Sequence, residues 1–94
     1  MMHRKDDNHK SIADAFRRCG WIVTDTSWSR GRLLDMIIDR CKGEHYYVEV
    51  KKNDKSIMTT LEMKFIHEHP GLCKLVWSIE QVLEMSGRPQ STAF

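Results

Sequence analysis

Two short apolar runs joined by a tight turn constrain the fold of this chain more than any other feature of its sequence. The first run spans 33–39, the turn 40–43 contains a glycine, and the second run spans 44–51. The second run alternates along its length and is rich in β-branched and aromatic residues, so the pair predicts a β-hairpin. Within it stand Glu49 and Lys51, two charged residues that a packed apolar strand does not require.

The remainder of the chain predicts three helices and two more strands around this hairpin. Capping-box patterns at Thr59-x-x-Glu62 and Ser78-x-x-Gln81 mark the starts of two helices. In chain order the expected elements are a helix at 7–19, strands at 21–23, 33–39 and 44–51, a helix at 60–69, a strand at 73–77 and a helix at 79–86. The order α-β-β-β-α-β-α predicts an α/β fold in which helices flank a central mixed sheet.

Length and composition limit the class of protein. Ninety-four residues predict one domain, 1–94, with frayed ends at 1–5 and 88–94. The chain is 40% hydrophobic and 30% charged, and it has neither an apolar signal segment nor an apolar run near the roughly 18 residues of a membrane span. We therefore expect a soluble cytoplasmic protein without a membrane partner. Three widely spaced cysteines, an odd number, predict free thiols rather than disulfides.

The charged residues of the hairpin are expected to converge on one small volume. Side chains alternate between the two faces of a strand, so Glu49 and Lys51 share one face while Val48 and Val50 share the other. With the turn centred on 42–43, Asp35 comes to lie opposite the region of Glu49 to Lys51. The hairpin thus predicts two carboxylates from neighbouring strands with one ammonium beside them.

That set fits metal-assisted hydrolysis of a phosphodiester. Magnesium keeps several waters and is held by one or two carboxylates, so the predicted ligands are Asp35, Glu49 and the Val50 carbonyl, with manganese as the alternative ion. Such an ion polarises the phosphate and lowers the pKa of a bound water. Lys51 orients that water or stabilises charge that develops on the phosphate. The alternative is structural: a surface ion pair of Glu49 with Lys51, worth about 0–1 kcal/mol, with Asp35 capping a loop.

Basic and aromatic residues gather in sequence around the same hairpin. The residues predicted to contact nucleic acid are Arg30, Arg32, Lys52, Lys55 and Trp28. Such a grouping suits a polyanion and predicts DNA as the partner. The net charge of +2 does not itself distinguish a DNA-binding protein from one with an ordinary charged surface.

These residues make the chain resemble the PD-(D/E)xK nuclease superfamily, and within it the small VRR-NUC-like nucleases of phages and bacteria. RLLDMII resembles the family strand that carries the aspartate, here Asp35, and YYVEVKK resembles the E-x-K strand, here Glu49 and Lys51. Supporting likeness runs over about 5–85, through the segments KDDNHKSIADAFRRCGWIV, SIMTTLEMKFIHEH and LVWSIEQVLEM. Two departures are Leu34, where the family usually has proline, and the loop TSWSRGRL, which has one glycine where the family usually has several.

The resemblance implies a restriction-endonuclease-like core, a bacterial or phage-infected cell as the setting, and two accessory residues. Asn8 stands where the family often faces the metal, although asparagine also caps helices. Glu62 either assists the metal ligands or only completes the capping box with Thr59. His9 stands where relatives often have glutamine or glutamate, and we expect it to face solvent.

The expected function is that of a magnesium-dependent endonuclease acting on DNA. One alternative is a resolvase that selects branched, Holliday-junction-type DNA, and another is a non-catalytic DNA-binding module that keeps the nuclease fold. One site of this kind cuts one strand, so we expect a homodimer. A dimer would also cover apolar residues of the C-terminal half that a small core is not expected to hide, namely Leu75, Trp77, Val82 and Leu83.

Overall fold

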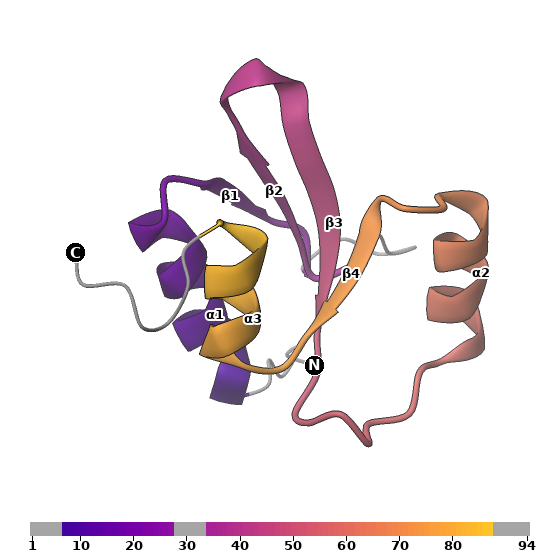
Figure 1. Ribbon diagram of the computed structural model, residues 1–94. Helices are drawn as coiled ribbons and strands as arrows, with labels where there is room; N and C mark the ends of the chain where they lie inside the picture. Colours follow the sequence, from indigo (N-terminus) through magenta and orange to yellow (C-terminus); the bar gives the residue numbers. More distant parts are fainter. Residues whose placement is uncertain (1–6, 28–33, 88–94) are drawn as a thin grey trace.

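Helices and strands follow one another in the order predicted from the sequence (Figure 1). The computed structural model describes residues 7–27 and 34–87, so the predicted frayed ends lie outside the described residues. The described elements are α1 (Asp7–Arg18), β1 (Ile22–Asp25), β2 (Met36–Arg40), β3 (Glu44–Val50), α2 (Thr60–Glu68), β4 (Cys73–Val76) and α3 (Ile79–Met85). They form a small α/β domain with a mixed sheet, which confirms the fold class at this level.

The sheet has the strand order β1-β2-β3-β4. The pairs β1–β2 and β2–β3 are antiparallel, whereas β4 runs parallel to β3 after a crossover through α2. The predicted hairpin is therefore present, with a register that pairs Met36 with Val48 and Arg40 with Glu44. Its turn is a short 3-10 segment, Cys41–Gly43, in which Gly43 has a φ of 79°, a conformation that favours glycine.

The second strand begins later than the sequence pattern indicates, at Met36 rather than at residue 33. The two residues just before it are hydrogen-bonded to Thr26, which directly follows the first strand. Thr26 donates from its N–H to the Asp35 carbonyl and from its hydroxyl to the Leu34 carbonyl. On the other side the Asp35 carboxylate, not its backbone, accepts from Val50. On the β3 side a bond to the Asp35 side chain thus replaces a backbone bond of the regular ladder.

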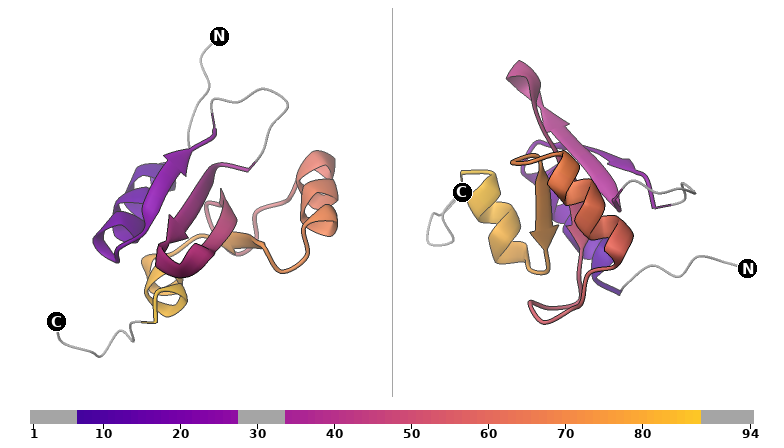
Figure 2. Two further views of the ribbon diagram at one scale, coloured as in Figure 1. Left: turned by 90° about the horizontal axis from the view of Figure 1, so that it is seen from above. Right: turned by 90° about the vertical axis from the view of Figure 1, so that its right-hand side faces the viewer.

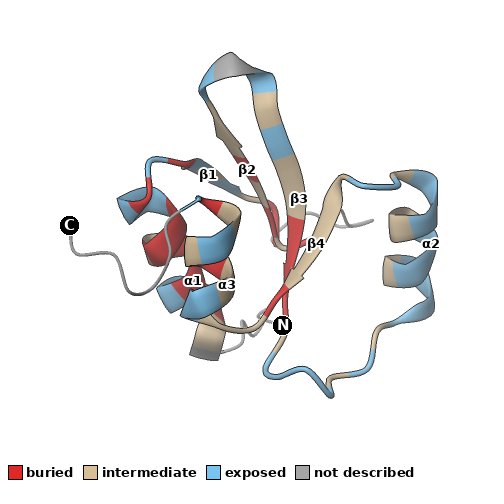
Figure 3. Cartoon of the chain, in the orientation of Figure 1, coloured by how far each residue is buried: buried red, intermediate tan, exposed pale blue. Residues whose placement is uncertain are grey.

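The core lies between the sheet and the helices α1 and α3, which cover the same face (Figures 1 and 2). The buried residues gather in this layer, as Figure 3 shows. The largest fully buried side chains are Phe16, Ile12, Leu34, Met36, Ile38, Val48, Val50, Val76 and Val82. Trp21 closes one end of the core, where its ring nitrogen donates to the Ser86 hydroxyl at 2.8 Å.

Helix α2 lies on the opposite face of the sheet and is packed more loosely (Figures 2 and 3). None of its nine residues is buried, although the predicted capping box of Thr59 and Glu62 is formed. Its C-terminal half contacts the sheet through a ring cluster in which Tyr47 lies 5.1 Å from Phe65 and 5.4 Å from His69, measured between ring centroids. Helices shorter than about 12–15 residues are marginal alone, so these few contacts decide where α2 sits.

The C-terminal apolar residues that favoured a dimer are largely covered within one chain. Val82 is fully buried, Leu83 packs against the core, and Leu75 and Trp77 are half-buried. Within 7–27 and 34–87 the large hydrophobic side chains that remain exposed are Ile22, Ile57, Leu61, Met63 and Ile79. The homodimer stays a prediction, without the surface that we expected to support it. Among the described residues no helix has the length and hydropathy needed to cross a membrane.

Asn8 joins α1 to the ends of two strands. Its Nδ2 donates to the backbone carbonyls of Lys51 and Trp77, each at 3.0 Å. These carbonyls follow the parallel strands β3 and β4, so one side chain fixes the first helix against both.

We expect Asn8→Ala to lower the free energy of unfolding by about 1–3 kcal/mol, because two partly buried carbonyls lose their donor. Urea unfolding followed by circular dichroism measures the change. Ser11→Ala, at an exposed position of the same helix, serves as the control and should stay within about 0.5 kcal/mol of the wild type. Equal losses in the two variants would show that Asn8 does not tie the elements together.

Candidate active site

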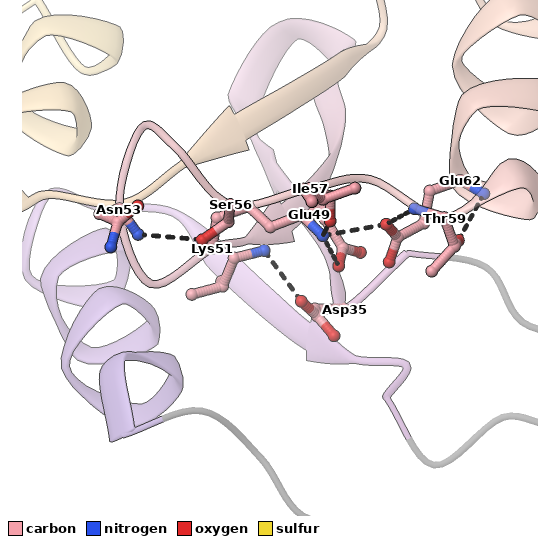
Figure 4. Close-up of polar contacts among 9 residues, drawn as sticks. Asp35, Glu49, Lys51, Asn53, Ser56, Ile57, Thr59 and Glu62 are labelled. Carbon is pink, nitrogen blue, oxygen red and sulfur yellow. Dashed lines mark hydrogen bonds and ion pairs between the residues drawn. The ribbon is translucent and has the colours of Figure 1, made fainter.

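Asp35, Glu49 and Lys51 lie together at the open end of the hairpin, as the sequence predicted (Figure 4). Val48 and Val50 are buried in the core, so the alternation of β3 directs Glu49 to the opposite face of the sheet. The register of β2 with β3 brings Asp35 level with Glu49. Asp35 Oδ2 then accepts a hydrogen bond of 2.8 Å from the Val50 N–H, which fixes the carboxylate beside β3.

The Val50 carbonyl faces the same side as the Asp35 carboxylate. The N–H of Lys51 donates to the Val76 carbonyl of β4 at 2.9 Å. The C=O and N–H of one trans peptide point in opposite directions, so the Val50 oxygen points away from β4 and toward β2. This is the direction that a ligand shared with Asp35 requires.

Glu49 is the most deeply buried carboxylate of the site, with 5% of its surface exposed. Its Oε1 atom finds no hydrogen-bond partner among the described residues. Burial raises the pKa of Glu49 to about 9, and the hydrogen bond with Glu62 and the charge of Asp35 add to the rise, whereas Lys51 opposes it. A buried polar atom without a partner is costly and rare, so this oxygen is the position at which a cation is expected to bind.

Lys51 is bound more closely by Glu62 than by Glu49. Its Nζ lies 2.9 Å from Glu62 Oε1, 3.2 Å from the Ile57 carbonyl and 3.6 Å from Glu49 Oε2 (Figure 4). The side chains of Lys51, Glu49 and Glu62 are exposed by only 12%, 6% and 12%. The alternative of a surface pair between Glu49 and Lys51 therefore does not describe this group, because it is largely buried and includes a third residue.

The two partners at the 2.9 Å contact keep opposite charges. Burial by itself lowers the pKa of Lys51, but the hydrogen bond to Glu62 and the charges of Glu62 and Glu49 outweigh it and leave this pKa raised. Burial by itself raises the pKa of Glu62, but hydrogen bonds from Glu49, from the Thr59 N–H and from Lys51 lower it to about 2. Lys51 is thus a donor at neutral pH and Glu62 is a carboxylate.

The donor set fits a hard divalent cation held by few protein ligands. Within 7–27 and 34–87 no group of three or more His, Cys, Asp or Glu side chains is arranged to hold a metal. Asp35 and Glu49 with the Val50 carbonyl supply two carboxylates and one backbone oxygen, and magnesium completes such a set with water. The free Oε1 of Glu49 is the observation that favours a cation there. A four-ligand zinc site does not fit these residues.

The remaining predicted site residues are spread more widely. Lys52 and Lys55 are exposed on the segment that follows β3, which suits contact with a large polyanion. Trp28, Arg30 and Arg32 lie outside the described residues.

Asn8 and Glu62 occupy roles that differ from their predicted alternatives. Asn8 lies inside α1, and its amide binds backbone carbonyls rather than capping the helix. Glu62 completes the predicted capping box and also binds Lys51, a contact that was not predicted, whereas its assistance to the metal ligands stays a prediction.

The prediction that His9 faces solvent is wrong. His9 is 5% exposed, and its Nε2 lies 3.9 Å from Asp25 Oδ1 without a hydrogen bond to any described residue. A signal was present in the sequence, because His9 stands three and four residues before Ile12 and Ala13 on the apolar face of α1.

The raised pKa of Glu49 predicts that the metal-free protein becomes less stable as pH rises. An unfolded glutamate titrates near 4.5, so between that pH and about 9 the folded chain binds the extra proton. The stabilisation is complete below the unfolded pKa and is lost as pH passes through the folded pKa. The contribution of Glu62 to stability does not change over this window. Its pKa is lowered to about 2, so that contribution is lost only in acid.

We therefore expect the melting temperature in a chelating buffer to fall more steeply with pH in the wild type than in Glu49→Gln. The amide keeps the shape of the side chain and does not titrate, and every other group is the same in the two proteins. Differential scanning fluorimetry between about pH 5 and pH 9 measures the two slopes. Parallel curves would contradict a proton held by Glu49.

Comparisons of this chain with protein-family models, with curated proteins and with solved structures give no significant match. The resemblance to the PD-(D/E)xK nucleases therefore rests on the residues quoted above, and the function follows as a proposal.

Proposed function

We propose that this protein is a metal-dependent deoxyribonuclease that hydrolyses DNA phosphodiester bonds with Asp35, Glu49 and Lys51. The observation that carries the proposal is the buried Glu49, whose Oε1 lacks a partner beside a second carboxylate and an ammonium. The α-β-β-β-α-β-α order, with both carboxylates at the open end of one hairpin, supports a restriction-endonuclease-like core as part of the same proposal.

Each residue of the site has a distinct task in this reaction. A magnesium or manganese ion held by Asp35, Glu49 and the Val50 carbonyl supplies Lewis-acid activation of the phosphate and of a water. The Val50 N–H keeps Asp35 oriented, and Glu49 would lose its proton to solvent if a cation were bound at its free oxygen. Lys51 acts as a charged hydrogen-bond donor to the phosphate rather than as a base, because its pKa is raised by Glu62.

The DNA contacts of the proposal extend along the segment after β3. Lys52 and Lys55 are exposed there, one and four residues beyond Lys51. Ammonium groups at these positions neutralise phosphates without reading bases. Trp28, Arg30 and Arg32 complete the proposed contacts.

One observation favours a second candidate, a DNA-binding module without catalysis. The ammonium of Lys51 is already bound by Glu62 and the Ile57 carbonyl, so this part of the site is satisfied without a metal. One measurement distinguishes the two candidates. The nuclease cleaves DNA when a divalent cation is present, whereas the non-catalytic module binds DNA without cleaving it.

We expect Asp35→Asn and Glu49→Gln each to lower magnesium-dependent cleavage by roughly a hundredfold or more, as for loss of one transition-state contact. Both changes preserve side-chain shape and remove an anionic ligand. The assay uses linear, nicked, single-stranded and four-way-junction DNA with magnesium or manganese, and EDTA as the blank. Preference for the junction would favour the resolvase.

Glu80→Gln, at an exposed position of α3, is the matched control and should cleave like the wild type. Cleavage at the wild-type rate by both site variants would refute the assignment. Binding of DNA by a wild-type protein that never cleaves it would favour the non-catalytic module.

Lys51 and Lys52 offer a second test because they are adjacent in sequence but differ in environment. Lys51→Ala should lower kcat by about two orders of magnitude, since it removes a donor near the phosphate. Lys52 is exposed, so Lys52→Ala should weaken DNA binding and reduce the salt-dependence slope by about 0.9, the value for one phosphate contact. Single-turnover kinetics and binding at several salt concentrations separate the two effects, and equal losses of kcat would contradict the assignment.

A further inference from the structure

Glu62 directs a carboxylate into the site from an element outside the sheet (Figure 4). It stands in the first turn of α2, and its Oε1 accepts two hydrogen bonds of 2.9 Å, one from Lys51 Nζ and one from the Thr59 N–H. Only 12% of its side chain is exposed. A capping glutamate at a helix end does not need such burial, so the capping box alone does not account for this placement.

The ammonium of Lys51 is held mainly by the segment that leads into α2. A lysine ammonium has three donors on a flexible four-carbon stem, so its position depends on the acceptors around it. The two shortest contacts come from Glu62 at 2.9 Å and the Ile57 carbonyl at 3.2 Å, whereas Glu49 on the same strand lies at 3.6 Å. The direction of the ammonium is thus set from outside the strand that carries it.

The same contact holds the N-terminal half of α2 near the sheet. The helix has no buried residue, and the rings that contact Tyr47 are Phe65 in its second half and His69, the residue that caps its C-terminus. Leu61, next to Glu62, is 70% exposed. The Lys51–Glu62 pair therefore links a loosely packed helix to the largely buried charges of the site.

We propose that Glu62 is a positioning residue that holds the Lys51 ammonium beside Glu49 and thereby couples the seating of α2 to the site. Its importance for turnover rests on the proposed nuclease function, whereas the positioning itself does not. Glutamine serves a capping box as well as glutamate does, so Glu62→Gln removes the charge that binds Lys51 and retains the helix start. This separation makes the proposal testable without loss of the fold.

The first test measures how fast an amine-acylating reagent modifies Lys51, with peptide mass spectrometry as the readout. The exposed Lys52 and Lys55 on the same segment serve as internal standards. We expect wild-type Lys51 to react more slowly than either standard, because its ammonium is largely buried and held by Glu62, and we expect Glu62→Gln to raise its rate several-fold as the ammonium is released. Glu68→Gln, at an exposed position in the last turn of α2, should leave the rate unchanged.

A third variant separates the charge from the helix cap. Thr59→Ala removes the hydroxyl that accepts from the Glu62 N–H but leaves the Glu62 carboxylate in place. An equal rise in Lys51 labelling in Thr59→Ala would overturn the proposal, since loosening of the helix start would then explain the effect. An unchanged labelling rate in Glu62→Gln would also overturn it.

The second test is kinetic. We expect Glu62→Gln to lower kcat about tenfold with little change in KM, because the ammonium is misplaced for a transition-state contact while DNA binding persists. Wild-type kcat in Glu62→Gln would refute a part for Glu62 in turnover. Raised labelling in Glu62→Gln together with a wild-type protein that cleaves no DNA would refute the nuclease and support the positioning, so the two failures are distinguishable.

Discussion

The register between β2 and β3 determines where the charged groups that the hairpin carries into the site lie. Pairing of Met36 with Val48 puts both side chains in the core and leaves Glu49 on the other face, level with Asp35. A shift of one residue would exchange the faces and direct Glu49 into the layer covered by α1. Such a shift would bury the Glu49 carboxylate among aliphatic side chains, with no ammonium to offset its desolvation. Because that burial costs free energy, the observed register is favoured over the shifted one. The site is a consequence of how the core packs.

Three carboxylates and one ammonium share a small volume at this end of the hairpin, and their protonation follows from that imbalance. Lys51 offsets one negative charge, and its shorter contact is to Glu62 rather than to Glu49. Glu49, the more buried of the two, consequently holds its proton, with its pKa raised to about 9. Removing one partner from such a buried group leaves an uncompensated charge, so the arrangement is a weak source of stability in a small domain. A second cation would relieve the same imbalance, and this is the electrostatic reason to expect a metal beside Glu49.

The sequence predicted the parts of this site that depend on periodicity and missed those that depend on the path of a loop. Alternation along 44–51 was sufficient to place Glu49 and Lys51 opposite Asp35, and both capping boxes were readable from four-residue spacings. The contact of Lys51 with Glu62 was not readable, because it requires the course of 52–58, which has no repeating pattern. The buried position of His9 was readable from helical spacing with the apolar face of α1. Helical position therefore outweighs the polarity of the imidazole in deciding the burial of His9.

Lys51 is fixed at both of its ends, and the two ends are held from opposite faces of the sheet. Its backbone carbonyl accepts from Asn8 of α1, and its N–H donates to Val76 of β4. Its ammonium, at the far end of the side chain, is held by Glu62 of α2. An ordinary ion pair does not require its lysine to be anchored in this way, since most of its modest benefit survives in many geometries. Chemistry at a phosphate does require it, because a donor displaced by about 1 Å loses much of its effect. The anchoring of a single lysine by both helix layers therefore supports the proposed nuclease, because the proposed chemistry requires a fixed donor and an ordinary ion pair does not.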